Sequence, residues 1–226
     1  MELSDAIHSR ISARAFLDKP VAQKTVQQLI ELARHAPSGS NMQPWHVHAV
    51  SGKVKEKVIK DALDFAAKNP IGSVKKEFQT PVENFVQPYK SRRYDVGMGL
   101  YDALGIDRKD KVRRQEQLMQ NFYFFGAPVG LFFSIHRSLM PGQLGDLGIF
   151  MGNVMLAARE FELHTCAQGF WQDVQPVLHD VLDIPEDYFI FNGMALGYID
   201  PAHPANSLVS GRESVERFCQ FDGFEQ

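Results

Sequence analysis

The segment from residue 145 to residue 161 constrains the fold of this chain more than any other part of the sequence. It has helical spacing, yet its large apolar side chains point in nearly every direction around the helix axis. A helix that is apolar on all sides must be covered on several sides. Because a chain of 226 residues has few elements to cover it, we expect one covering surface to belong to a second copy of the chain in a closed twofold dimer. The apolar residues are Leu147, Ile149, Phe150, Met151, Val154, Met155, Leu156 and Phe161.

The composition is that of an ordinary globular protein. Hydrophobic residues make up 44% and charged residues 23% of the chain, which argues against disorder. A formal net charge of −3 argues against binding to nucleic acid or to a membrane mainly by charge. The two cysteines, Cys166 and Cys219, lack CxxC or metal-like spacing, which argues against a disulfide scaffold. Since no apolar signal core and no apolar run of about 20 residues is present, we expect a cytoplasmic protein.

Hydrophobic periodicity and turn residues predict an α+β arrangement, in which helices flank four or so strands without a regular βαβ repeat. Residues 68–105 contain three prolines and scattered aromatic residues. We predict that they form a surface excursion or lid on a single domain spanning residues 1–226. Helices are predicted at 4–10 (with Ser4 as N-cap), 26–36, 53–67, 110–125, 145–161 and 174–182, and strands at 46–50, 129–135, near 166 and 188–198.

Several common catalytic motifs are absent from the sequence. It has no GxGxxG after a strand, no GxxxxGK[ST] and no HExxH, so a Rossmann domain, a P-loop and a zincin are poorly supported. His46 and His48 share one face of a predicted strand. Because two ligands alone make a weak metal site, a polar strand face is the better interpretation, and we expect no metal.

The first segment with chemical potential is residues 10–16, which read RISARAF. In an extended chain, Arg10, Ser12 and Arg14 point to one side. Two guanidinium groups beside a hydroxyl suit a phosphate, because arginine binds phosphate through a planar fork. Arg212 could join them if the C-terminal segment folds back. Taken alone, the segment is better interpreted as a solvated basic turn.

Two further segments place polar groups beside strands. The loop PSGSNMQPW, residues 37–45, offers hydroxyl and amide groups that suit a ligand rich in hydroxyls, carbonyls and ring nitrogens. Its alternative is a plain loop, since these residue types form turns. Gln168 and Gly169 follow a predicted strand, where a glycine lets a ligand approach the backbone. The alternative there is a strand-ending turn.

Together and in this order, these segments resemble the nitroreductase family of flavoproteins, and most closely its nitrobenzoate reductase branch. Residues 121–128 (NFYFFGAP), 148–159 (GIFMGNVMLAAR) and 193–198 (GMALGY) also resemble that family. The resemblance covers essentially the whole chain. It implies a central, mainly antiparallel sheet flanked by helices in an intertwined homodimer, with two FMN molecules at the subunit interface.

The resemblance also implies roles for individual residues. Arg10, Ser12 and Arg212 would hold the FMN phosphate, the backbone of Gln168 and Gly169 would face flavin N5, and the loop after the second helix would line the ribityl chain and ring. Many relatives have a basic residue where this chain has Ser210, for which Arg14 is the expected substitute, and Glu where it has Gln168. The loop residues are Pro37, Ser38, Ser40, Asn41 and Gln43.

A flavin brings its own redox chemistry, which agrees with the lack of an acid–base pair, a nucleophile or a metal cluster in the sequence. The expected reaction is hydride transfer from NAD(P)H to flavin N5, followed by two-electron transfer to a nitroaromatic or quinone in a ping-pong sequence. Trp45, Tyr123, Phe124 and Phe125 are candidates to wall the shared face of the flavin. Core packing is the alternative for each of these residues.

Two other functions fit the same residues. One keeps the fold and FMN but has an enone, a quinone or a halogenated aromatic compound as the acceptor. The other is a flavin- or ligand-binding protein without turnover.

Overall fold

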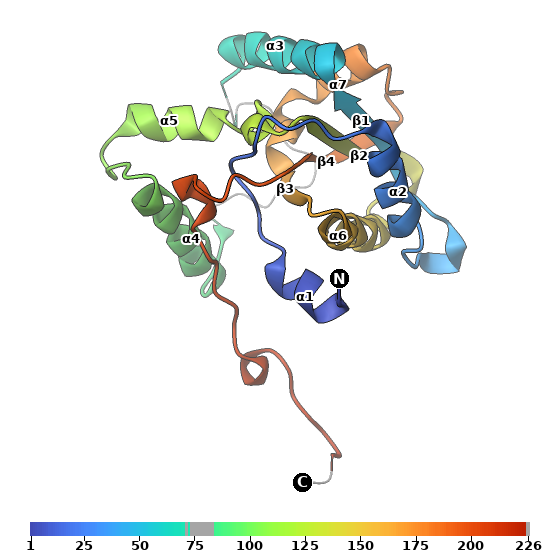
Figure 1. Ribbon diagram of the computed structural model, residues 1–226. Coiled ribbons are helices and arrows are strands. Elements are labelled where there is room, and N and C mark those ends of the chain that lie inside the picture. Colours follow the sequence, from blue (N-terminus) through green and yellow to red (C-terminus); the bar gives the residue numbers. More distant parts are fainter. Residues whose placement is uncertain (71, 73–83, 225–226) are drawn as a thin grey trace.

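A four-stranded antiparallel sheet lies at the centre of the computed structural model, which describes residues 1–70, 72 and 84–224 (Figure 1). Its strand order is β1-β2-β4-β3. All three pairings in the described part of the chain are antiparallel, which confirms the predicted α+β class with an antiparallel sheet. The strands are β1 (His46–Ser51), β2 (Val129–His136), β3 (His164–Gln168) and β4 (Tyr188–Gly197).

The strand β2 explains why the sheet has helices on both faces. Seven of its eight residues are buried, so both of its faces need cover. Leu131 and Phe133 face the core formed with α2 (Gln23–Ala33) and α6 (Leu144–Glu160). Phe132, which points to the opposite face, belongs to the core formed with the helices α3 and α7. These two helices span Gly52–Lys68 and Gln175–Leu182.

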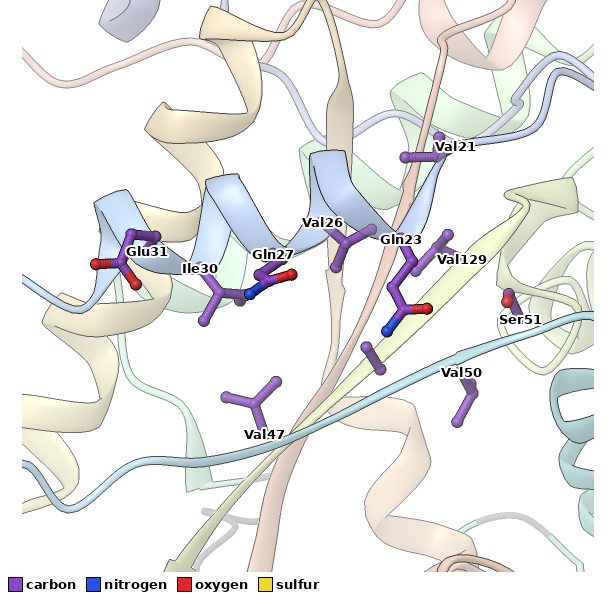
Figure 2. A pocket seen from close by; sticks show the side chains of 11 residues that line it. Val21, Gln23, Val26, Gln27, Ile30, Glu31, Val47, Val50, Ser51 and Val129 are labelled. Atoms are coloured by element: carbon purple, nitrogen blue, oxygen red, sulfur yellow. The ribbon is translucent and has the colours of Figure 1, made fainter.

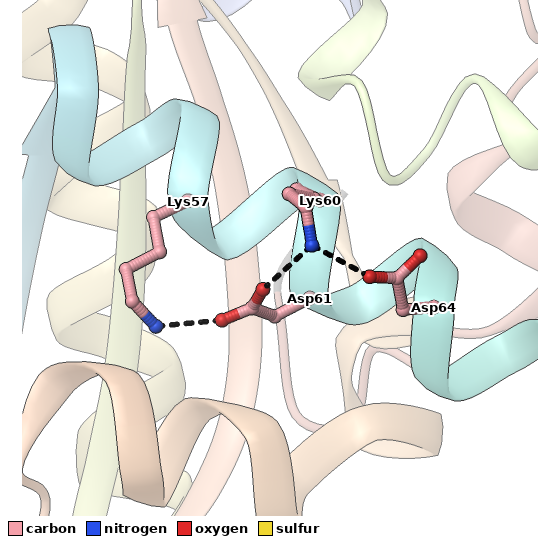
Figure 3. A network of polar contacts seen from close by, with 4 residues as sticks. All are labelled: Lys57, Lys60, Asp61 and Asp64. Atoms are coloured by element: carbon pink, nitrogen blue, oxygen red, sulfur yellow. Dashed lines mark hydrogen bonds and ion pairs between the residues drawn. The ribbon is translucent and has the colours of Figure 1, made fainter.

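The outer face of α3 is covered by charges. Lys57 Nζ lies 2.6 Å from Asp61 Oδ2, and Lys60 Nζ lies 2.8 Å from Asp64 Oδ2 and 3.7 Å from Asp61 Oδ1 (Figure 3). Ion pairs between residues four positions apart, such as these, are typical of a helix face that is exposed to solvent. It marks the outside of the α3 layer as a surface that needs no partner.

The helix α6 is buried on most sides, as its composition predicts. Leu147, Phe150 and Val154 are completely buried against the sheet and α2. The side that carries Gly148 faces solvent, and Ile149 beside it is 46% exposed. The described chain therefore leaves one apolar face of its most apolar helix uncovered.

Two predicted helix boundaries are wrong, and one predicted feature of a helix start is confirmed. The first helix, α1 (Leu3–Ser9), begins before Ser4, so Ser4 is not its N-cap. The helix α5 (Lys111–Met119) ends well before the predicted end at Phe125. The chain continues in turns, and the backbone at Phe124 and Phe125 is left-handed, with φ of 52° and 53°. The helix α7 has Pro176 in its first turn, as predicted.

The predicted excursion at residues 68–105 contains the helix α4 (Tyr89–Ala103). Residue 71 and residues 73–83, on which part of that prediction falls, lie outside the described residues. Short 3-10 turns complete the fold: η1 (Gly39–Asn41), η3 (Phe124–Gly126), η4 (Arg137–Leu139), η5 (Gly169–Val174), η6 (Pro204–Asn206) and η7 (Val215–Arg217).

The C-terminal segment extends away from the rest of the chain beyond Glu213, which pairs with Arg92 of α4 (Figure 1). Large apolar side chains along it are exposed: Val209 by 84%, Phe218 by 71% and Phe224 by 75%. Such a row of exposed apolar residues indicates an interaction surface. Within the described residues, no helix has the length and apolar character needed to cross a bilayer.

Candidate functional site

The segment 10–14 lies along the outer edge of β3. Ser12 forms a parallel bridge with Thr165, and the backbone N–H of Ala13 donates to the carbonyl of Thr165 at 3.0 Å. Ala13 is completely buried, whereas Ser12 is exposed. The alternation predicted from the sequence is therefore present, and the Arg10–Ser12–Arg14 side of the segment faces outward.

Asn206 folds the C-terminal segment back onto this edge. Its Oδ1 accepts a hydrogen bond from the backbone N–H of Arg14 at 2.7 Å, and its Nδ2 donates to the carbonyls of Ala15 at 2.9 Å and Asp200 at 2.8 Å. All three bonds fix the backbone, so Asn206 positions the arginine-bearing segment. Sequence reasoning missed this residue, because an asparagine in a turn carries no sign that its partner lies 192 residues away.

The fold-back creates a basic cavity of about 630 Å³, here called the phosphate pocket. It gathers Arg10, Ser12, Arg14 and Arg212, which the sequence analysis placed in one cradle. No carboxylate is among the residues that line it. Arg212 Nη1 donates to Ser210 Oγ and to the carbonyl of Ser210, both at 2.9 Å. Arginines and a hydroxyl without a counter-charge are the donor set that a phosphate group requires.

Gln168 and Gly169 lie at the end of the same strand. The Gln168 side chain is buried, where Nε2 donates to the carbonyl of Asn121 at 2.7 Å and Oε1 accepts from Trp171 Nε1 at 3.4 Å. A Cβ built on Gly169 meets nothing within 4 Å. The Gln168 amide therefore supports the neighbouring loop from inside, and the backbone at Gly169 is open to a flat ligand.

The loop 37–43 is tied to the first turn of α6. The backbone N–H of Gly39 donates to Asp146 Oδ2 at 3.0 Å, and that of Gln43 donates to Ser38 Oγ at 3.0 Å. Ser40, Asn41 and Gln43 are exposed and have left-handed backbone, with φ of 51°, 56° and 48°. Such a backbone in non-glycine residues is uncommon and is concentrated at functional sites.

A single chain does not bring this loop to the phosphate pocket. The pocket adjoins the last turn of α6, where Arg159 Nε donates to Ser9 Oγ at 3.2 Å and the N-terminal ammonium binds Glu160 at 2.9 Å. The loop adjoins the first turn, and the 17 residues of α6 span about 25 Å at 1.5 Å per residue. The predicted site is thus divided between the two ends of one helix.

The four aromatic wall candidates have different environments. Phe124 and Phe125 lie in the core, where Phe124 stacks on Trp171 with ring centroids 4.6 Å apart. Trp45 stacks on Phe150 of α6, with centroids 4.8 Å apart and an interplanar angle of 9°. Tyr123 is 42% exposed. Core packing therefore describes the two phenylalanines, and Tyr123 and Trp45 keep surface that a ligand can reach.

Burial and the charge of Arg159 shift the pKa values of side chains near the pocket. Its Nη1 donates to the carbonyl of Leu163 at 2.8 Å and to His164 Nδ1 at 2.9 Å. Burial, followed by the charge of Arg159, lowers the pKa of His164 to about 4. Burial also raises the pKa of the Cys166 thiol to about 11, so Cys166 is not a nucleophile at neutral pH.

A second cavity, of about 520 Å³, lies between α2 and the outer edge of β1 (Figure 2). Figure 2 shows Val26 and Ile30 of α2 on one side and Val47 of β1 on the other. It contains no residue predicted for the site. Because β1 is an edge strand of the described sheet, the backbone groups on its outer side have no neighbouring strand to pair with.

Comparisons with known proteins agree with the sequence resemblance. The sequence profile of the nitroreductase family matches residues 7–198. A nitrobenzene nitroreductase from Ectopseudomonas oleovorans is 35% identical over 97% of this chain and 96% of its own length. A 4-nitrobenzoate reductase from Nocardioides sp. (strain LMS-CY) is 37% identical over 98% of this chain and 90% of its own. The crystal structure of the FMN- and NADPH-dependent nitroreductase NfnB from Sphigopyxis sp. strain HMH superimposes with a TM-score of 0.93, at 33% identity over 99% of this chain and 100% of that one.

Proposed function

This chain belongs to the nitroreductase family, and from that premise we propose that it is an FMN-dependent enzyme that uses NAD(P)H to reduce a nitroaromatic compound of the nitrobenzoate type, or a quinone. The observation that carries the proposal is the phosphate pocket, where Arg10, Arg14 and Arg212 converge without a carboxylate. Relatives named for nitrobenzene and 4-nitrobenzoate reduction support the acceptor class.

The residues of the pocket fit the phosphate of FMN. Arg10, Arg14 and Arg212 would bind its oxygens, with Ser12 as a further donor. Gly169 would let the ring approach the backbone, because no side chain occupies that place. Bound FMN supplies the redox chemistry, accepting hydride from NAD(P)H and delivering two electrons to the acceptor.

We further propose a homodimer in which each FMN site takes one half from each chain. The loop 37–43 and the phosphate pocket lie at opposite ends of α6. If two α6 helices pack antiparallel across a twofold axis, the first turn of one helix meets the last turn of the other. The exposed side of α6 suits such packing, because Gly148 and Gly152 have open space above them and Ile149 is exposed.

The exposed C-terminal residues fit the same dimer. Val215, Phe218, Phe221 and Phe224 are 47% to 75% exposed in a single chain. The groove beside β1 offers apolar side chains and an unpaired strand edge, which an extended segment can use for backbone hydrogen bonds. We assign the C-terminal segment of the partner to this groove.

Cofactor binding tests the proposal most directly. The purified protein should be yellow, and cofactor extraction should return FMN. Arg10→Ala and Arg212→Ala should each weaken FMN binding at least tenfold, because a hydrogen bond to a charged group contributes about 1.5–3 kcal/mol. Fluorescence titration of the apoprotein measures this, with Arg34→Ala as a control, since Arg34 pairs with Glu31 on the surface. Extraction of FAD, or unchanged affinity in both variants, would contradict the proposed pocket.

Turnover separates the enzyme from a flavin-binding protein. Under anaerobic conditions, NAD(P)H should reduce the bound FMN, and 4-nitrobenzoate should then reoxidise it. A panel with a quinone, an enone and a halogenated aromatic compound ranks the acceptors. A flavin that NAD(P)H does not reduce would refute the enzymatic proposal.

A further inference from the structure

A second basic cavity, of about 410 Å³, lies between α4 and the beginning of α5. Three arginines line it, Arg93 from α4, Arg108 from the connection and Arg114 from α5, and no carboxylate does. The predicted FMN site includes none of the three. Below, this cavity is called the arginine cleft.

The positive charge of the arginine cleft is not neutralised. Across residues 1–70, 72 and 84–224, the ion pairs include neither Arg93 nor Arg108 nor Arg114. Arg114 Nη1 donates to the carbonyl of Arg108 at 3.0 Å, but Arg114 Nε is buried and has no hydrogen-bond partner. A buried N–H without a partner costs stability, and an anion bound in the cleft would supply the missing acceptor.

Aromatic rings accompany the arginines. The Arg114 guanidinium lies 4.8 Å from the centroid of the Tyr101 ring, and that of Arg108 lies 5.6 Å from the centroid of Tyr94. Tyr94 is 48% exposed. A flat ring can stack on a tyrosine or on a guanidinium plane, so the cleft suits a ligand that joins an anionic group to an aromatic ring.

The arginine cleft adjoins the phosphate pocket. Val96 of α4 lines both cavities, so a ligand held in the cleft lies next to the proposed FMN site. A long ligand anchored here can extend toward the place where the flavin is reduced.

We propose that the arginine cleft binds the adenosine 2′-phosphate end of NADPH and so makes NADPH the preferred donor. This inference rests on the proposed function, and it names the donor for the same site. A phosphate monoester carries a charge of about −1.5 to −2 at neutral pH, which three unpaired guanidinium groups match better than the single charge of a benzoate. NADH lacks this group. The nicotinamide end can still share the flavin face with the acceptor, so a ping-pong sequence is unaffected.

The test uses the FMN-loaded, oxidised protein and a ligand without redox activity. Isothermal titration with ADP-ribose 2′-phosphate should show binding at least tenfold tighter than with ADP-ribose, because only the first ligand carries a phosphate monoester. Arg114→Gln and Arg93→Gln should each weaken binding of ADP-ribose 2′-phosphate about tenfold or more and leave binding of ADP-ribose unaffected. Lys90→Gln is the matched control, because Lys90 lies on α4 outside the cleft.

Anaerobic flavin reduction completes the experiment. The wild-type protein should be reduced at lower concentrations of NADPH than of NADH, and Arg114→Gln should remove this difference by affecting NADPH alone. Arg93, which is exposed, provides a variant that should fold even if Arg114→Gln does not. Equal binding of ADP-ribose and ADP-ribose 2′-phosphate, or binding of the 2′-phosphate that survives both substitutions, would overturn the inference. The inference would also be overturned if Arg114→Gln weakened the binding of 4-nitrobenzoate. Failure of both NADH and NADPH to reduce the flavin would instead refute the proposed function.

Discussion

Acidification should loosen the base of the phosphate pocket through His164. Arg159 can only donate hydrogen bonds, so the 2.9 Å contact of its Nη1 requires His164 Nδ1 to be unprotonated. Protonation would replace this bond with two adjacent positive charges. Arg159 also binds Ser9, the residue before Arg10, so the disturbance should reach the pocket.

The sign and size follow from the pKa values. The folded state favours the neutral imidazole, because burial and Arg159 lower the pKa of His164 from 6.5 to about 4. The unfolded chain therefore binds more protons in this range, and the stabilisation, complete above pH 6.5, is lost as the pH falls toward 4. The limiting loss is about 3.4 kcal/mol, and the same pKa values give about 2 kcal/mol at pH 5. Partial exposure of the imidazole reduces the expected loss at pH 5 to about 1 kcal/mol.

Urea unfolding at fixed protein and FMN concentrations, at pH 8, 7, 6 and 5, measures this loss. His164→Asn keeps an acceptor near the position of Nδ1 but cannot be protonated. Between pH 7 and pH 5, its free energy of unfolding should therefore fall by about 1 kcal/mol less than that of the wild type. His35→Gln, which alters an exposed histidine, should behave like the wild type. A parallel loss of stability in the wild type and in His164→Asn would show that the Arg159–His164 contact does not cause this pH dependence.

Three further predictions concern packing, assembly and kinetics. Gly193→Ala should destabilise the protein by about 1–3 kcal/mol in thermal or urea unfolding, because its Cβ would lie 2.2 Å from the buried Trp171 ring; unchanged stability would show that the ring can move. Gly148→Leu should fit within one chain, because a Cβ at this position meets nothing, but it should convert the proposed dimer to a monomer in sedimentation velocity. Glu56→Leu, on the solvated face of α3, is the control and should leave the dimer intact. A dimeric Gly148→Leu variant would exclude α6 from the interface. Initial rates at several fixed acceptor concentrations should give parallel double-reciprocal plots, as for ping-pong exchange, and intersecting lines would show that donor and acceptor bind together.

The sheet and its helices could be predicted because their signals are local. The apolar run of β2 and the helical spacing of α3 and α6 identify these elements without knowledge of their neighbours. The end of α5 could not be predicted, because residues 120–123 look helical in sequence. In the structure they form turns that lead into the left-handed Phe124, whose ring fills the space over Gly130 in β2.

The residues of the candidate site could be proposed from the sequence, but their arrangement could not. Arg10, Ser12 and the loop 37–43 became candidates because the short motifs that contain them resemble the nitroreductase family when taken together and in order. The contact of Asn206 with Arg14 depends on the path of the whole chain, and so does the inward turn of the Gln168 amide. The arginine cleft left no sequence signal, since its arginines are spread over 22 positions in a segment without a motif.

The division of the site between the two ends of α6 has a genetic consequence. In the proposed homodimer, a chain with Arg10→Ala and a chain with Asn41→Ala would each form dimers in which both sites carry one defect. Co-expressed in one cell, they would also form mixed dimers, in which one site carries both defects and the other carries neither. With random pairing, about half of the dimers are mixed, so about a quarter of all sites regain both intact halves. If the proposed dimer forms, two defective alleles would thus complement each other, whereas two alleles altered within the same half would not.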